Sequence, residues 1–71
     1  MTLNHGDRVE LLAMPSDPDP IPVGSRGTVM AVSNHVTGGE RWLQVDVAWD
    51  SGRTLMLVIP PDRVRVSDSA D

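Results

Sequence analysis

Hydrophobic and polar residues alternate along short runs of this chain, and glycines and prolines separate the runs. The clearest alternation spans Arg41 to Trp49, where the odd positions are apolar and the even positions, apart from Trp42, are polar or small. A period of two is typical of a strand with one buried face and one solvent face, and no run keeps a helical period. The pattern therefore predicts an all-β chain with a strand from Arg41 to Trp49.

A second apolar run, Arg53 to Ile59, follows the turn residues Asp50-Ser51-Gly52 and predicts a hairpin. With a three-residue loop and Gly52 in the left-handed conformation, the apolar residues of the two strands face one another. The expected pairs are Trp49 with Arg53, Val47 with Leu55, Val45 with Leu57 and Leu43 with Ile59. A two-residue loop shifts the pairing by one residue and mixes the two faces. The three-residue loop is therefore predicted, with a core seam formed by Leu43, Val45, Val47, Trp49, Leu55, Leu57 and Ile59.

Three further strands are expected in runs of β-branched and apolar residues that glycine or proline delimits. They cover Asp7 to Leu12, about Arg26 to Ser33, and Val64 to Val66. In the second of these runs both parities carry apolar residues, so the identity of its inward face stays open. The residues that follow it, Asn34 to Glu40, contain two glycines and predict a hairpin loop.

Proline interrupts the strands at two places. Four prolines between Pro15 and Pro22 exclude a central strand or a helix from the segment Ala13 to Ser25, which is predicted to be a long, stiff loop. Pro60 and Pro61 together remove two backbone donors from the ladder. A single 3-10 turn is therefore expected before the last strand.

The element order is strand, long loop, strand, hairpin loop, strand, tight turn, strand, helical turn and short strand. This is the order of a small five-stranded SH3-like barrel. We expect one such domain over residues 1–66 and a flexible acidic tail over residues 67–71. The core is expected to be thin, because a chain of this size buries only about 60% of the surface that it exposes when unfolded.

Several short motifs also occur in a defined order along the chain. They are Gly6-Asp7-Arg8-Val9-Glu10-Leu11, Met14-Pro15, Asp17-Pro18, Pro20-Ile21-Pro22, Gly24, Gly27-Thr28-Val29, Trp49-Asp50-Ser51-Gly52-Arg53 and Asp62-Arg63. From about Gly6 to Val66 the chain thereby resembles the domain-of-unknown-function 4314 family of small bacterial and phage proteins. Ser51 stands where that family commonly has asparagine and Val64 where an aromatic residue is usual. The resemblance implies the fold and a bacterial or phage setting, and it implies no established activity.

The composition argues against several classes of protein. All six basic residues are arginines, and ten acidic residues give a net charge of −4. This balance disfavours tight nonspecific binding of nucleic acid, which depends on neutralising phosphates. Cysteine is absent, which excludes disulfides and thiolate zinc sites. Neither a signal peptide nor an apolar stretch of about 20 residues is recognisable, so a soluble cytoplasmic protein is expected.

No cofactor, metal site or catalytic site is expected. Asp17 and Asp19 alternate with prolines in the first loop, but calcium takes about six to eight oxygen ligands and no third acid stands at a suitable spacing. Serine and histidine occur outside any nucleophile motif, and no phosphate-binding glycine loop follows a strand. The interior of so small a barrel is filled by its own side chains. The sequence therefore predicts a protein that is not an enzyme.

The outer face of the Arg41–Trp49 strand carries the most informative single residue, Trp42. Alternation gives it the same-face neighbours Gln44, Asp46, Met56 and Val58. An exposed tryptophan beside methionine and valine is typical of a protein-contact surface, and a stiff proline loop loses little entropy on binding. That Trp42 instead covers the barrel edge or packs under the first loop stays an open alternative. The candidate binding residues are Trp42, Met56, Val58, Pro20 and Pro22.

The leading hypothesis is a binding module that recognises another protein or itself. Grooves for proline-rich peptides and cages for methyl-lysine need several aromatic residues, whereas this chain has two tryptophans and neither tyrosine nor phenylalanine. The alternative is a nucleic-acid-associated module in which Arg26, Arg41 and Arg53 contact phosphates and Trp42 stacks on bases. No membrane partner is expected.

Overall fold

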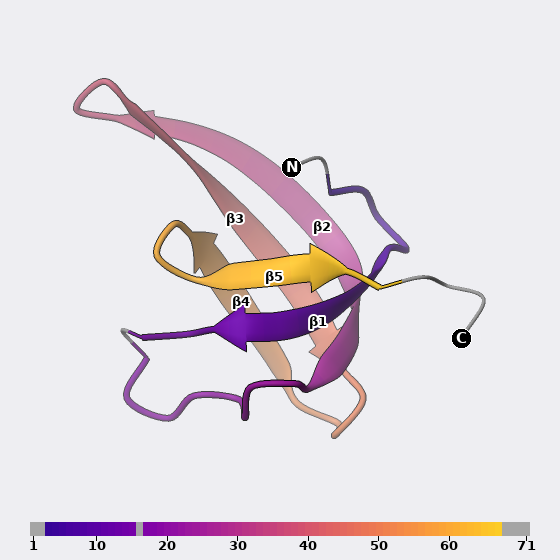
Figure 1. Cartoon of the computed structure of the whole chain (residues 1–71). Coiled ribbons are helices and arrows are strands. Elements are labelled where there is room, and N and C mark those ends of the chain that lie inside the picture. The colour runs from indigo at the N-terminus through magenta and orange to yellow at the C-terminus, as the bar shows by residue number, and fades with distance from the viewer. Residues whose placement is uncertain (1–2, 16, 68–71) are drawn as a thin grey trace.

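The computed structural model describes residues 3–15 and 17–67 of the chain (Figure 1). Its regular elements are the strands β1 (Arg8–Ala13), β2 (Arg26–Thr37), β3 (Glu40–Trp49), β4 (Thr54–Ile59) and β5 (Arg63–Val66). They form one antiparallel sheet in the order β4-β3-β2-β1-β5. The predicted all-β fold with five strands is therefore confirmed. The described residues contain no helix long and apolar enough to span a membrane.

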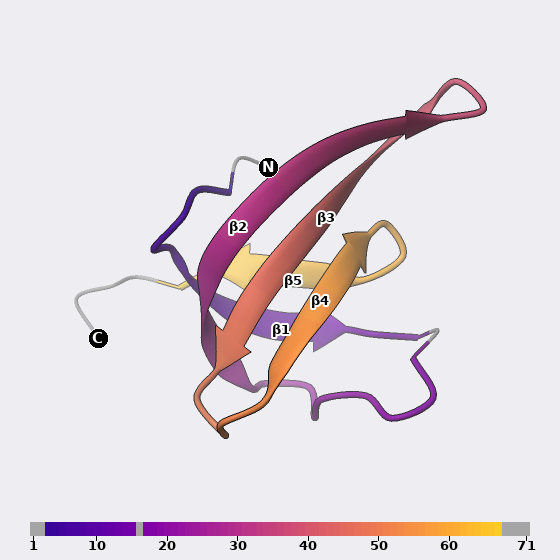
Figure 2. The same cartoon turned by 180° about the vertical axis from the view of Figure 1, so that it is seen from behind.

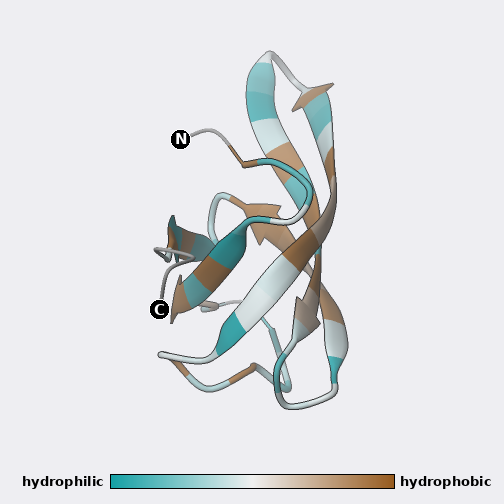
Figure 3. Cartoon of the chain, turned by 90° about the vertical axis from the view of Figure 1, so that its right-hand side faces the viewer, coloured by the Kyte–Doolittle hydropathy of each residue, from teal (hydrophilic) through white to brown (hydrophobic). Residues whose placement is uncertain are grey.

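The sheet folds over itself, so that β1 and β5 lie across the layer formed by β3 and β4 (Figures 1 and 2). Polar and apolar bands alternate along the strands, as Figure 3 shows, and the apolar set of each layer meets in one core. The fully buried members of that core come from all five strands and are Val9, Leu11, Val29, Val45, Val47, Leu57 and Val64. Both ends of the sheet therefore contribute to a single hydrophobic cluster.

The predicted register of the β3–β4 hairpin is confirmed. Val47 pairs with Leu55, Val45 with Leu57 and Leu43 with Ile59. The N–H of Trp49 donates to the carbonyl of Arg53 at 2.8 Å across a three-residue loop, in which Gly52 has a φ of 97°. Since glycine adopts a positive φ without steric cost, Gly52 allows this loop and thereby keeps the apolar faces in phase. Val45, Val47, Trp49 and Leu57 are buried, and the rest of the predicted seam packs against them.

A bulge in β2 explains why its inward face could not be read from alternation. Val29 pairs with Val47, but Ala31 pairs with Asp46, so Met30 is an extra residue in the ladder. Before the bulge the odd positions of β2 face the core, and after it the even positions do. Met30 itself is 49% exposed.

The β2–β3 hairpin is longer than predicted, and the expected loop from Asn34 to Glu40 is wrong. The ladder continues to the pair Thr37–Glu40, and only Gly38 and Gly39 form the loop. Their φ values of 59° and 82° are those of a type I′ turn, whose twist matches that of the flanking strands. The tip of this hairpin therefore projects beyond the rest of the sheet (Figures 1 and 2).

The expected 3-10 turn before β5 is replaced by a wider turn. The N–H of Asp62 donates to the carbonyl of Val58 at 3.0 Å, a bond across four residues, whereas a 3-10 turn bonds across three. Oδ2 of Asp62 in turn accepts the N–H of Val58 at 3.0 Å. The turn is therefore closed by one side chain and one backbone bond to the same residue.

The loop between β1 and β2 has no regular secondary structure in its described residues. Met14 and Ile21 are 6% and 2% exposed and pack into the core. The N–H of Gly24 donates to the carbonyl of Leu11 at 2.8 Å. The loop is thus anchored at two apolar positions and at its end. Of the expected tail, Ser67 alone is described, and its N–H donates to the carbonyl of Arg8 at 2.7 Å.

Candidate binding surface

Met56 and Val58 lie on the outer face of β4, where the predicted register puts them. They pair with Asp46 and Gln44 of β3. Met56 is 47% exposed and Val58 is 36% exposed, although both neighbour the core residue Leu57 in sequence. Strand β4 therefore presents apolar side chains to solvent on one face and to the core on the other.

Trp42 lies on the outer face of β3, as predicted, but its side chain is half-buried and not freely exposed. The imidazole of His35 stacks on the indole, with ring centroids 4.3 Å apart and planes inclined by 19°. The indole N–H donates to Oγ1 of Thr37 at 3.0 Å. Both contacts come from the part of β2 that was predicted to be a loop. Stacking and the hydrogen bond together fix the orientation of the indole.

Three open hollows border the exposed side chains of Met56 and Val58 on β4. The Met30 hollow is lined by Met30, Asp46, Val47, Thr54, Leu55 and Met56. The Pro18 hollow is lined by Asp17, Pro18, Met56, Val58, Pro61 and Asp62. The Trp42 hollow is lined by Thr37, Glu40, Arg41, Trp42, Val58 and Pro60. Met56 lines the first two and Val58 lines the last two, so the hollows adjoin one another around β4, the first and third on the side of β3 and the second at the free edge of β4. Together we call them the β4 groove.

The hollows have volumes of about 360, 210 and 410 Å³ in that order. Sites for small molecules occupy roughly 300–1,000 Å³ and bury most of the ligand. Two of the hollows reach the lower end of that range, but all three are open to solvent and would leave much of a small ligand exposed.

Each hollow contains at least one carboxylate, and two of these carboxylates already serve turns. Asp62 accepts the N–H of Val58, and Oδ1 of Asp17 accepts the N–H of Asp19 at 2.8 Å. Asp46 lies exposed on the outer face of β3. Within residues 3–15 and 17–67, no three histidine or carboxylate side chains gather closely enough to hold a metal ion.

Of the predicted loop prolines, Pro18 lines the groove, whereas Pro20 and Pro22 do not. Asp17 and Pro18 line the Pro18 hollow. The predicted binding residues Pro20 and Pro22 are exposed on either side of the buried Ile21. Ile21 anchors this stretch, while Asp17 and Pro18 make the contact of the loop with the groove.

The three arginines of the nucleic-acid hypothesis do not gather into one patch. Both Nη atoms of Arg53 donate to the carbonyl of Asp19 at 3.3 Å, so this guanidinium ties the first loop to the β3–β4 turn. Arg26 lies near that turn, because its carbonyl accepts the N–H of Asp50 at 2.9 Å. Arg41 lies at the other end of β3, eight residues or roughly 26 Å away from Trp49 along an extended strand.

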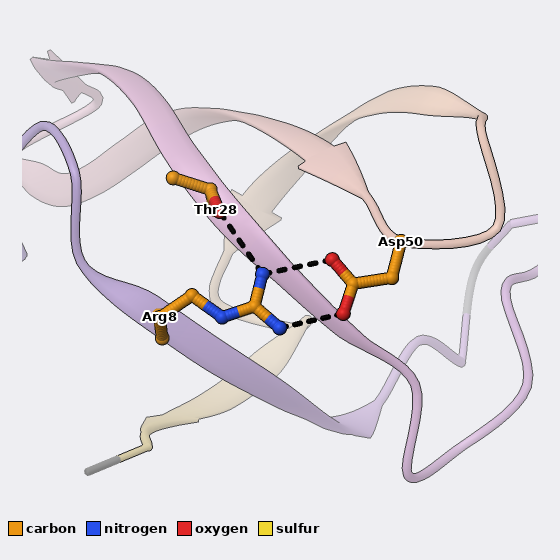
Figure 4. A network of polar contacts seen from close by, with 3 residues as sticks. All are labelled: Arg8, Thr28 and Asp50. Atoms are coloured by element: carbon orange, nitrogen blue, oxygen red, sulfur yellow. Dashed lines mark hydrogen bonds and ion pairs between the residues drawn. The ribbon is translucent and has the colours of Figure 1, made fainter. Parts of the chain in front are cut away.

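Two further arginines, Arg8 and Arg65, make ion pairs beside β1. Arg8 binds Asp50 through two hydrogen bonds, at 2.8 Å and 2.5 Å, and donates to Oγ1 of Thr28 at 3.0 Å (Figure 4). The hydrogen bond from Arg8 lowers the pKa of Asp50 and raises that of Arg8. Arg65 of β5 likewise binds Glu10 of β1, with one bond at 2.7 Å, and lowers the pKa of Glu10. These pairs join strands and the β3–β4 turn, so they serve the fold.

Several residues that line or support the groove could not be predicted from the pattern of alternation. Met30 enters it because of the bulge, and His35 supports Trp42 only because β2 continues beyond Ser33. The glycine pair after Thr37 is a signal that could have revealed the longer strand, since two adjacent glycines favour a two-residue type I′ loop. No alternation signal marks a bulge of one residue.

Comparison with known proteins identifies the chain at the level of a family. A family model described as Domain of unknown function (DUF4314) matches residues 2–67, which is nearly the whole chain. No curated protein and no solved structure matches it. The match includes the β1 motif, the β3–β4 turn and the turn before β5, on which the resemblance rested. The chain therefore belongs to the DUF4314 family.

Proposed function

We propose that this chain is a non-catalytic binding module that recognises a protein through the β4 groove, in the bacterial or phage setting that its family resemblance implies. The observation that carries the proposal is that three hollows adjoin one another around exposed apolar side chains of β4. Three hollows share the exposed side chains of Met56 and Val58 as walls, and the oriented indole of Trp42 borders one end. Methionine and aromatic residues are enriched at protein contacts relative to the rest of a protein surface.

The carboxylates in the groove support binding more than catalysis. Asp62 and Asp17 accept backbone N–H groups of their own turns. Their hydrogen bonds hold the turn before β5 and the first loop in place beside β4. A general acid or base must also reach its substrate in a sheltered cleft, and these hollows are open.

The proposal is tested by removing the apolar character of the groove without changing its shape or charge. The double variant Met56→Gln/Val58→Thr does this, because both replacements are close to isosteric. The matched control is Leu12→Gln/Val66→Thr, which changes two side chains that are 37% and 49% exposed on β1 and β5 and line none of the three hollows. Circular dichroism and urea unfolding establish that both variants fold.

The assay is affinity purification from bacterial lysate with the native chain and both variants in parallel, followed by a titration with the purified partner. We expect the partner to bind the native chain and the control equally and to bind the groove variant at least several-fold more weakly. Equal binding by all three chains, or loss with the control alone, would place the contact elsewhere and refute the proposal. Light scattering on the same samples measures self-association.

A further inference from the structure

The second half of β2 has an unpaired edge. Strand β1 pairs with the first three residues of β2, and the segment before β1 bonds to Val29. From Met30 to Thr37, β3 is the only described strand that pairs with β2. The end of this hairpin projects beyond the other strands (Figures 1 and 2). We call the free side of residues 30–37 the β2 edge.

The hydrogen-bonding phase of the hairpins fixes which residues point to the β2 edge. The N–H of Trp49 donates to the carbonyl of Arg53, so the odd residues of β3 direct their backbone groups toward β4. The even residues of β3 therefore face β2, where their partners are Ala31, Ser33, His35 and Thr37. The alternate residues of β2 direct their N–H and C=O groups away from β3, and these are Val32, Asn34 and Val36. Within residues 3–15 and 17–67, no backbone hydrogen bond from outside the ladder reaches these three residues.

The β2 edge lacks the features that keep edge strands from pairing. Natural proteins protect such edges with charged side chains, prolines, covering segments or very short strands. Residues 30–37 include no proline, no glycine and no residue charged at pH 7, and Val36 is 67% exposed. By contrast, two of the four residues of β5 are arginines, and Asp62 occupies the N–H and the C=O of Val58 at the edge of β4. The β2 edge is therefore the side of the sheet that is open to another strand.

The β2 edge is ordered although it lies beyond the core. His35 stacks on Trp42 with ring centroids 4.3 Å apart, and the indole N–H donates to Oγ1 of Thr37 at 3.0 Å. Both contacts lie on the outer face of the hairpin and hold its two strands together without covering the edge. A strand that is already ordered loses little conformational entropy when another strand pairs with it.

The side chains along the edge match those of a second copy of the chain. In an antiparallel pair with a two-fold axis at Asn34, Val36 faces Val32 of the other copy and Asn34 faces its own equivalent. Every outward N–H and C=O group of the three edge residues then has a partner. A two-fold axis at His35 would instead set Val36 against Asn34. The absence of charge on these strands means that the net charge of −4 brings no like charges into direct contact there.

From these observations we propose that the chain forms a symmetric dimer in which the β2 edges of two copies pair antiparallel about Asn34. A two-fold contact uses the same patch of both copies, so the pairing ends at the dimer. Association is also a usual source of stability for a chain with so small a core. None of Val32, Asn34 and Val36 lines the three hollows of the β4 groove, so this inference goes beyond the proposed function and is tested separately from it.

The first test places charges at the two-fold axis. Asn34→Asp and Asn34→Lys each set like charges opposite one another in the dimer, whereas a one-to-one mixture of the two variants sets opposite charges there. The matched control Val23→Lys adds a charge at a position of the first loop that is 71% exposed. Sedimentation is measured from about 10 µM to 1 mM, because a single strand pair makes a small and weak interface. Circular dichroism establishes that each variant folds.

We expect the native chain and Val23→Lys to dimerise equally with rising concentration. Each Asn34 variant alone should dimerise at least several-fold more weakly, and the mixture should recover the association. A merely structural role of Asn34 would not produce this recovery, because each chain in the mixture still carries its own substitution.

The second test follows amide hydrogen exchange of the native chain by nuclear magnetic resonance at the two ends of the concentration range. In the monomer the N–H groups of Val32, Asn34 and Val36 point to solvent, so they should exchange fast at low concentration and become protected in the dimer. The N–H groups of Ser33 and His35 bond within the ladder and should be protected at both concentrations. This alternation distinguishes strand pairing from a contact of side chains alone.

Four results would overturn the inference. A chain that stays monomeric throughout the concentration range forms no such dimer. A dimer that tolerates both Asn34 variants, or a mixture that does not recover, excludes pairing about Asn34. Dimerisation that is lost in Met56→Gln/Val58→Thr and kept in the Asn34 variants would place self-association in the β4 groove. Protection of the three edge amides only when the purified partner binds would assign the edge to a strand of that partner.

Discussion

Replacement of Gly27 by alanine tests how closely β2 and β3 approach one another. Gly27 pairs with Trp49 at the start of β2 and is buried. A Cβ atom added there would lie 2.7 Å from Cγ1 of Val47 and 2.8 Å from the carbonyl oxygen of Ala48. The oxygen belongs to the backbone of the neighbouring strand and cannot rotate away. The two strands must therefore separate by several tenths of an ångström to admit the methyl group.

The expected cost follows from these contacts. Overpacking a filled core by one methyl group costs about 1–3 kcal/mol. Where a glycine has ordinary dihedral angles and free space, alanine instead stabilises by about 0.4–1 kcal/mol through the unfolded state. We expect a net loss of about 1–2 kcal/mol for Gly27→Ala. A domain of this size has a free energy of unfolding of about 3.5–11 kcal/mol, so this loss is a large fraction of it. Each kcal/mol lowers the Tm of such a domain by about 4–8 °C, so we expect Tm to fall by about 4–16 °C.

The assay is urea unfolding followed by tryptophan fluorescence, since Trp49 lies directly across from Gly27 in the ladder. Unchanged or increased stability of Gly27→Ala would refute the close approach, because that is the result expected of a glycine with free space. In the background Val47→Ala, the penalty of Gly27→Ala should shrink, since the shortest of the three contacts is then removed. An undiminished penalty would attribute the cost to the backbone contact with Ala48 alone.

Two further predictions concern the polar contacts that close the fold. Asp62→Ala leaves the N–H of Val58 without its side-chain acceptor and should lower the free energy of unfolding, measured in urea, by about 1–3 kcal/mol. Asp62→Asn keeps an oxygen at this place and should cost less. Equal stability of the alanine variant and the native chain would contradict this prediction. Arg8 and Arg65 lower the pKa values of Asp50 and Glu10 in the folded state. Both ion pairs therefore contribute fully to the stability of the fold above the unfolded pKa values of about 4. This contribution is lost as the pH falls through the lower pKa values of the folded state. The urea midpoint should therefore fall more steeply between pH 5 and pH 2 for the native chain than for Asp50→Asn/Glu10→Gln, and parallel curves would show that neither pair is coupled to folding.

The β3–β4 hairpin was predictable because two independent signals agree there. Alternation sets the faces of both strands, and Gly52 sets the length of the loop. A shift of one residue would have turned the apolar side chains of one strand to solvent. Register is strongly specified under those conditions, and the placement of Met56 and Val58 on the outer face followed from it.

β2 was less predictable because its pattern is interrupted. The bulge at Met30 moves the core-facing residues from odd to even positions, so the run from Thr28 to Val32 reads as apolar on both faces. Beyond Ser33 the strand leaves the core, and its side chains need no hydrophobic alternation. The contact between His35 and Trp42 depends on this extension. Alternation therefore predicted the face on which Trp42 lies, but it could not predict that its side chain is half-buried.

Most residues that carry the family resemblance act on the fold, although Asp17, Pro18 and Asp62 also line the Pro18 hollow. Arg8 and Asp50 join β1 to the β3–β4 turn, and Gly27 permits the close approach of β2 and β3. Each of these acts on the packing of strands and none of them lines the groove. The groove depends instead on side chains that the core does not require, such as Met56 and Asp46. Their replacement should change binding while leaving the stability of the domain nearly unaffected, and this separation makes the proposed function testable with folded variants.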